Sequence, residues 1–86
     1  MEIREVLALN LRKKRTEAGL SQEELAHRAD IDRTYISALE RSLYNAGIDV
    51  VDRLAHELGL EAIDLLRRPT PSPAAGKPRK RKAASA

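Results

Sequence analysis

Cysteine is absent from the 86 residues of this chain. A disulfide framework, a thiolate metal site and a catalytic thiol are therefore excluded. The apolar runs are only a few residues long, and residues 1–5 (MEIRE) lack the basic and then apolar pattern of a leader. The sequence thus predicts neither a transmembrane helix nor a signal peptide. A chain of this length supplies one small domain at most, and we expect it to be soluble and cytoplasmic.

Proline is also absent until residue 69, and all four prolines lie in residues 69–86. That segment has no apolar periodicity, so we expect residues 1–68 to form the domain and residues 69–86 to be a disordered tail. The tail has no acidic residue but carries five cations: Lys77, Arg79, Lys80, Arg81 and Lys82. We expect the tail to contact nucleic acid without sequence preference, or to serve only as a solubility tail.

Without the tail, the overall net charge of +3 is lost. Residues 1–68 contain 11 basic and 13 acidic residues, a net charge of −2. A nucleic-acid surface on the domain must therefore come from a local cluster, for which the basic run 12–15 is the first candidate.

Alternating β-branched runs are missing as well, and the apolar residues before position 69 follow helical spacing. The sequence therefore predicts an all-α fold. Five helices are expected, over about 3–18, from Ser21 to about Asp30, from Asp32 to about Ser42, over about 49–58 and over about 61–67. The inward positions predicted for them are Leu7, Leu11, Ala18, Leu25, Ala26, Ala29, Ile31, Ile36, Leu39, Val51, Leu54, Ala55, Leu58, Ile63 and Leu66.

Local signals support the second and third helices. Ser21 with Glu24 three residues later forms a capping box, and Asp32 can cap the next helix. Gly19 and Gly59 are suited to left-handed helix ends. Two short helices joined by a turn of three to four residues have the geometry of a helix-turn-helix. This spacing alone does not separate a DNA-binding unit from a corner of a small helical bundle.

Two longer motifs carry more information. Residues 19–26 read GLSQEELA and residues 32–41 read DRTYISALER. Over about residues 3–66 the chain resembles the phage-repressor and Cro-type (XRE-like) helix-turn-helix family, and within it the controller proteins of restriction-modification systems. The resemblance implies a compact five-helix, lambda-repressor-like domain. It also implies a bacterial transcription regulator, associated with the nucleoid, whose partner is double-stranded DNA.

The resemblance places a recognition helix at about 32–42 in the major groove, and its candidates for base contacts are Arg33, Thr34, Tyr35 and Ser37. Arg33 can pair with both acceptors of guanine, or contact a phosphate. Thr34 can meet a thymine methyl or a phosphate, and Ser37 a base or a phosphate. Tyr35 is equally suited to packing against the preceding helix.

Phosphate contacts are expected from Gln22, Lys13, Lys14, Arg41, Tyr44 and Asn45. The first-turn position of Gln22 suits an anion, although the side chain can also be merely exposed. The two lysines can equally form a solvated helix face, and the other three can be plain loop residues. The resemblance further implies a largely buried ion pair between Arg15 and Glu40, which is structural.

The sequence departs from the family pattern at two turns. Asp30 and Ser42 stand where the family usually has glycine, and residues 46–47 replace a common Pro-Ser. Serine enters the left-handed conformation reluctantly, so we expect the third helix to continue further than usual.

Catalysis is not predicted. His27 and His56 are isolated in the sequence, and no nucleophile, phosphate loop or metal-ligand spacing accompanies them. We expect no enzyme activity, cofactor, metal or small-molecule effector. Two other functions remain open: a protein-interaction or antitoxin module, and a nonspecific nucleoid-binding protein that uses its basic tail.

The function that the sequence favours is a transcription regulator that binds a near-palindromic operator as a homodimer. Two recognition helices about 34 Å apart match successive major-groove turns. We expect the interface at the fourth and fifth helices and the loop before them. Its apolar candidates are Leu43, Val50, Ile63 and Leu65, with closure of the core as a second possibility for Leu43.

Overall fold

The computed structural model describes residues 2–69, which contain five α-helices and no strand. The helices are α1 (Ile3–Glu17), α2 (Gln22–Ala29), α3 (Arg33–Glu40), α4 (Ile48–Glu57) and α5 (Ala62–Leu66). None of these helices is long and apolar enough to cross a membrane. Apart from Pro69, the predicted tail lies outside the described residues.

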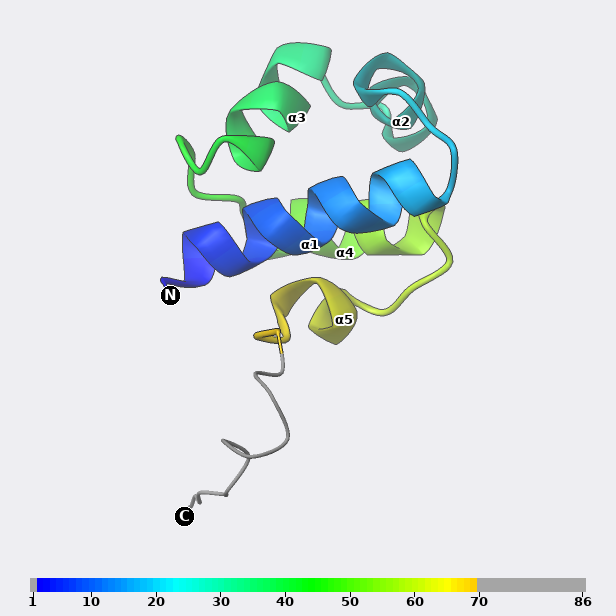
Figure 1. Ribbon diagram of the computed structural model, residues 1–86. Helices are drawn as coiled ribbons and strands as arrows, with labels where there is room; N and C mark the ends of the chain where they lie inside the picture. Colours follow the sequence, from blue (N-terminus) through cyan, green and yellow to red (C-terminus); the bar gives the residue numbers. More distant parts are fainter. Residues whose placement is uncertain (1, 70–86) are drawn as a thin grey trace.

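The helices pack on both sides of α1. α3 packs against α1 and α2, α2 also contacts α4, and α5 packs against α1 and α4. Figure 1 shows α3 and α5 on opposite sides of α1, with α2 beside α3. Whatever α3 presents to solvent therefore lies on a different face from α5.

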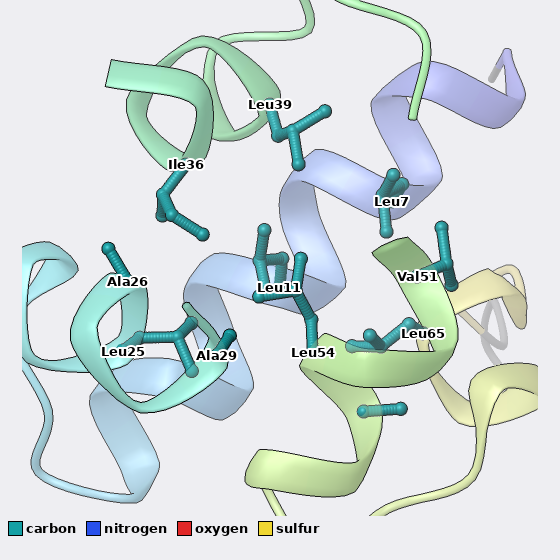
Figure 2. Packing of buried hydrophobic residues seen from close by; sticks show 11 residues of the cluster. Leu7, Leu11, Leu25, Ala26, Ala29, Ile36, Leu39, Val51, Leu54 and Leu65 are labelled. Atoms are coloured by element: carbon teal, nitrogen blue, oxygen red, sulfur yellow. The ribbon is translucent and has the colours of Figure 1, made fainter. Parts of the chain in front are cut away.

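All five helices contribute to one apolar core. Leu11 of α1 lies at its centre, next to Leu54 of α4 (Figure 2). The side chains that are nearly or completely removed from solvent are Val6, Leu11, Leu25, Ile36, Leu39, Leu54 and Leu65. The all-α prediction is confirmed, and so are most of the predicted inward positions. Val6 and Ala8 are buried residues that the prediction did not include.

Two of the predicted inward positions are wrong. Ala18 is exposed because α1 ends at Glu17 and Ala18 forms its C-cap. Ile63 is 58% exposed because α5, which begins after Glu61, turns Leu65 into the core instead. The burial of Leu65 also removes it from the predicted dimer interface. Leu43 is 59% exposed, so it does not close the core.

Four helices end in the same way. Gly19, Asp30, Ser42 and Gly59 have φ of 75°, 58°, 61° and 73°. At each end, the residue after the left-handed one donates its N–H to a carbonyl five residues earlier, as Leu43 does to Ala38 at 2.9 Å. This is the Schellman arrangement, which satisfies carbonyls that the helix end leaves free. The prediction that α3 continues was wrong, because Ser42 adopts the left-handed conformation and α3 ends at Glu40.

Candidate nucleic-acid interface

A short turn sets the angle between α2 and α3. Asp30 ends α2, and the Ile31 N–H donates to the Ala26 carbonyl at 2.9 Å. Ile31 is half-buried against the core. Asp32 then starts α3, because its Oδ1 accepts the N–H of Thr34 at 2.8 Å. Apolar contact and capping therefore fix where the first turn of α3 points.

That first turn is open to solvent. Arg33 and Thr34 are exposed, whereas Ile36 is completely buried on the other side of the helix. Ser37, one turn after Arg33, is partly exposed. The helix thus presents a cation and two hydroxyl groups at the end that enters the major groove in helix-turn-helix proteins.

Tyr35 links α3 to the loop that follows it. Its ring is half-buried and meets the ring of Tyr44 edge-on, with centroids 5.6 Å apart. The Tyr35 hydroxyl donates to the Asn45 carbonyl at 3.4 Å. Tyr44 and Asn45 are themselves exposed beside α3, as is Arg41 at its end. The aromatic pair therefore holds the loop that follows α3 next to this helix.

Arg15 and Glu40 form an ion pair between α1 and α3. Arg15 Nε lies 2.6 Å from Glu40 Oε2, and Arg15 Nη2 lies 3.0 Å from Oε1. The side chains are 12% and 3% exposed. Hydrogen bonding to Glu40 raises the pKa of Arg15, although burial partly opposes this shift. Two parallel N–H to oxygen bonds fix direction as well as distance, so the pair orients α3 on α1.

Gln22 joins this ion pair. Its Nε2 donates to Glu40 Oε1 at 3.0 Å, and the third Arg15 donor, Nη1, bonds the Leu20 carbonyl at 2.7 Å. The Gln22 side chain is therefore not simply exposed, because it connects the start of α2 to the end of α3. A phosphate contact by Gln22 remains a prediction.

Lys13 and Lys14 do not lie with the α3 residues. They line a surface pocket together with Asp64 and Arg67 from the α5 side of the molecule. Lys14 also lies 3.6 Å from Glu17 in an exposed pair. The structure thus separates these two lysines from the other predicted phosphate contacts.

The described residues contain no cluster of side chains suited to a metal ion. Within residues 2–69, no group of three or more His, Cys, Asp or Glu side chains could hold a metal ion. His27 and His56 are exposed on α2 and α4. The exposed first turn of α3 and the residues around it form the candidate site.

Comparison with known proteins identifies the family. Residues 11–65 match the family described as HTH_3, helix-turn-helix. The chain belongs to this helix-turn-helix family. Over 68 residues it is 44% identical to a hypothetical transcription factor of Neisseria meningitidis, and the aligned region covers 79% of this chain and 64% of that relative. It is 40% identical over 68 residues to the control protein C.SmaI of Serratia marcescens, and the aligned region covers 79% of this chain and 81% of that protein.

Solved structures of family members share the fold. The Neisseria transcription factor superposes with a TM-score of 0.77, covering 79% of this chain and 78% of that chain. The restriction-modification controller C.AhdI of Aeromonas hydrophila is 35% identical, with a TM-score of 0.70 over 72% of this chain and 94% of that one. The biofilm regulator SinR, solved in complex with DNA, is 29% identical, with a TM-score of 0.69 over 71% and 98%.

These relatives confirm the predicted resemblance. The HTH_3 family is one of DNA-binding transcription regulators of the XRE type, and restriction-modification controllers are among the relatives of this chain. The chain spans only 64% of the length of its Neisseria relative.

Proposed function

We propose that this HTH_3 protein is a transcription regulator that binds a specific, near-palindromic DNA operator as a homodimer. The observation that carries the proposal is the exposed first turn of α3, with Arg33 and Thr34 uncovered at the end of a helix whose orientation is fixed by the Arg15–Glu40 pair. A fixed helix with free donors at its N-terminal end suits direct readout of base edges.

The base contacts proposed are those of Arg33, Thr34 and Ser37. Tyr35 has a mixed role, because its ring and hydroxyl already engage Tyr44 and Asn45. Phosphate contacts are proposed for Gln22, Arg41, Tyr44 and Asn45, which lie at the start of α2 and around the end of α3. Such contacts position the duplex, whereas the α3 side chains select its sequence.

Homodimerisation is proposed through the apolar surface that α4, α5 and the preceding loop leave exposed. Leu43, Ile48 and Ile63 are 59%, 77% and 58% exposed, and Val50 is half-buried. Ile48 and Tyr44 also line an apolar surface pocket with Ile3 and Leu66. Large exposed apolar side chains commonly mark interaction surfaces.

Selection of bound duplexes from a random DNA pool tests the proposal. The full-length protein is compared with Arg33→Ala at about 150 mM salt, where nonspecific phosphate binding is weakened. We expect a motif with two-fold symmetry for the wild type, and loss or change of bases within each half-site for the variant. Unenriched DNA from both proteins would contradict sequence-specific binding, and a single unrepeated half-site would contradict the homodimer.

A further inference from the structure

The side chain of Gln22 is held in place before any DNA is bound. It lies in the first turn of α2, where its Nε2 donates to Glu40 Oε1 at 3.0 Å. Glu40 is the last residue of α3, and its side chain is 3% exposed. The two oxygens of this carboxylate are also bonded to Arg15, at 2.6 and 3.0 Å, which fixes their direction. Glu40 therefore offers Gln22 an acceptor at a fixed place.

The backbone that carries Gln22 is fixed as well. In the loop before α2, Leu20 donates its N–H to the Arg15 carbonyl at 3.1 Å, and its own carbonyl accepts from Arg15 Nη1 at 2.7 Å. Ser21 then caps α2, because its hydroxyl accepts the Glu24 N–H at 3.0 Å and its N–H donates to the Glu24 carboxylate at 2.8 Å. Both ends of the Gln22 side chain are thus anchored, the Cα by the loop and the cap, and the amide by the end of α3.

The bond to Glu40 determines which side of the Gln22 amide lies at this place. An amide has a nitrogen that donates two hydrogens and an oxygen that only accepts, whereas a carboxylate only accepts. The amide nitrogen must therefore face Glu40, and the bond uses one of its two hydrogens. Because the amide group is planar, the direction of the second hydrogen is fixed by the first. This second hydrogen is a donor that suits the oxygen of a DNA phosphate.

Fixing the amide in advance strengthens a contact that it makes later. Glutamine has a long side chain that loses rotamer freedom when it is immobilised. At an interface this loss lowers affinity by about two- to tenfold for each such side chain. In this domain the Gln22 amide is already bonded to Glu40 without DNA. A phosphate contact made by Gln22 therefore requires little further ordering of its side chain.

We propose that Glu40 is a positioning residue for the phosphate contact of Gln22. In addition to pairing with Arg15, it holds the Gln22 amide in the orientation that donates to the DNA backbone. One carboxylate then serves both the orientation of α3 and the phosphate contact at the start of α2. This inference rests on the proposed function, because it takes the phosphate contact of Gln22 as given.

A cycle between protein variants and modified DNA tests the proposal. Operator duplexes are made in which one phosphate at a time is replaced by an uncharged methylphosphonate, and their affinities are measured for the full-length wild type and for Gln22→Ala. Gln22→Ala should weaken binding to the unmodified operator about tenfold, but should have an effect of only about twofold when the contacted phosphate is replaced. The ratio of the two effects is the coupling between Gln22 and that phosphate.

The same coupling is then measured in two backgrounds that both lack the ion pair. Arg15→Met with Glu40→Gln retains a carbonyl oxygen at position 40 that can accept from Gln22, whereas Arg15→Met with Glu40→Leu retains no acceptor there. Each background is prepared with and without Gln22→Ala, and circular dichroism establishes that each protein is folded. Both backgrounds are uncharged at positions 15 and 40, so an effect of the lost ion pair on α3 is common to both. The comparison isolates the acceptor.

We expect the coupling to stay within about twofold of the wild-type value in the glutamine background and to fall about fivefold in the leucine background. An unchanged coupling in the leucine background would overturn the positioning role and leave the proposed function intact. Equal losses in both backgrounds would also overturn it, because they would assign the effect to the ion pair. Absence of coupling at every phosphate in the wild type would contradict the Gln22 contact in the proposed function, and the positioning role with it.

A measurement on the wild type alone does not depend on the folding of any variant. NMR relaxation of the DNA-free protein gives the order parameter of the Gln22 side-chain amide. The amide of Asn10, which bonds two carbonyls, is the ordered reference, and that of the exposed Asn45 is the solvent-exposed reference. We expect an order parameter for Gln22 close to that of Asn10, about 0.8 or higher. A value below about 0.6 would overturn the proposal.

Discussion

Two sides of α1 are held by different kinds of interaction. Toward α4 and α5, Leu11 packs against a cluster that includes Leu54 and Leu65, all of them completely buried. Toward α3, apolar packing is supplemented by Arg15 and Glu40, whose side chains are almost as deeply buried as the leucines. Apolar contacts allow a range of helix orientations, whereas a bidentate ion pair does not. The apolar side therefore supplies stability, and the polar side fixes the orientation of α3.

The largest effect is expected from the apolar side. Leu54→Ala removes a side chain with no exposed surface and should lower the free energy of unfolding by about 3–4 kcal/mol. A domain of this size commonly has only about 3–5 kcal/mol in total, so the variant should be largely unfolded. Urea denaturation followed by circular dichroism measures this loss. A decrease below about 1 kcal/mol would contradict the central role of this leucine.

The polar side gives the next effect. Glu40→Ala leaves the Arg15 guanidinium without its partner and should cost about 3 kcal/mol. The double variant Arg15→Met with Glu40→Leu replaces both charges and should recover most of that loss. Urea unfolding of Arg15→Met, of Glu40→Leu and of the double variant provides the coupling energy. Additive losses would show that the two side chains stabilise the domain independently.

If the ion pair orients α3, the double variant separates orientation from stability. It should be nearly as stable as the wild type, yet bind the operator less selectively, because apolar side chains do not fix the helix direction. Equal stability with unchanged operator selectivity would mean that packing alone positions α3.

A smaller effect, of opposite sign, is expected at the end of α3. Ser42 has φ of 61°, a conformation that costs an L-residue about 1–2 kcal/mol and glycine almost nothing. Ser42→Gly should raise the free energy of unfolding by about 0.5–1 kcal/mol after the greater freedom of glycine in the unfolded chain is considered. Thermal unfolding should show an increase in Tm of about 3–6 °C. Gly59→Ala, at the equivalent position after α4 with φ of 73°, is the reverse control and should lower Tm.

The smallest effect concerns the start of α2 and depends on pH. Hydrogen bonds from the Ser21 backbone and side chain lower the pKa of Glu24 below its ordinary value of 4.5. A carboxyl with a lowered pKa stabilises the fold above its unfolded pKa, and this contribution is lost as the pH falls through the folded value. Glu24→Gln should therefore be less stable than the wild type at pH 7, and the difference should shrink below about pH 4.5. A difference that is constant from pH 7 to pH 3 would exclude the charge as its source.

Much of the fold could be predicted because its signals are local. The Ser21–Glu24 box, the Asp32 cap and the left-handed glycines each act within one helix turn, and each is present. The register of α5 was not predictable in this way. With five residues, α5 is too short for a periodic pattern to decide whether Ile63 or Leu65 faces the core, and contact with α1 and α4 decides it.

The candidate site was predictable in part for the same reason. The exposure of Arg33 and Thr34 follows from the helical period and the buried position of Ile36. The bond from Gln22 to Glu40 joins residues 18 positions apart, and the placement of Lys13 depends on where α5 packs. The spacing of residues within one helix reveals neither a hydrogen bond between two helices nor the position of a residue relative to a distant helix.

The contacts of Asn10 also bear on how the domain folds. The Asn10 side chain, on α1, donates hydrogen bonds to the carbonyls of Leu65 and Arg67, which lie 55 and 57 positions later in the sequence. Contacts between residues far apart in the sequence form more slowly than local contacts, because chain entropy must be lost before they form. During synthesis, α1 can therefore contact α5 only after nearly the whole domain has been made. The fold is completed only when its first and last helices meet.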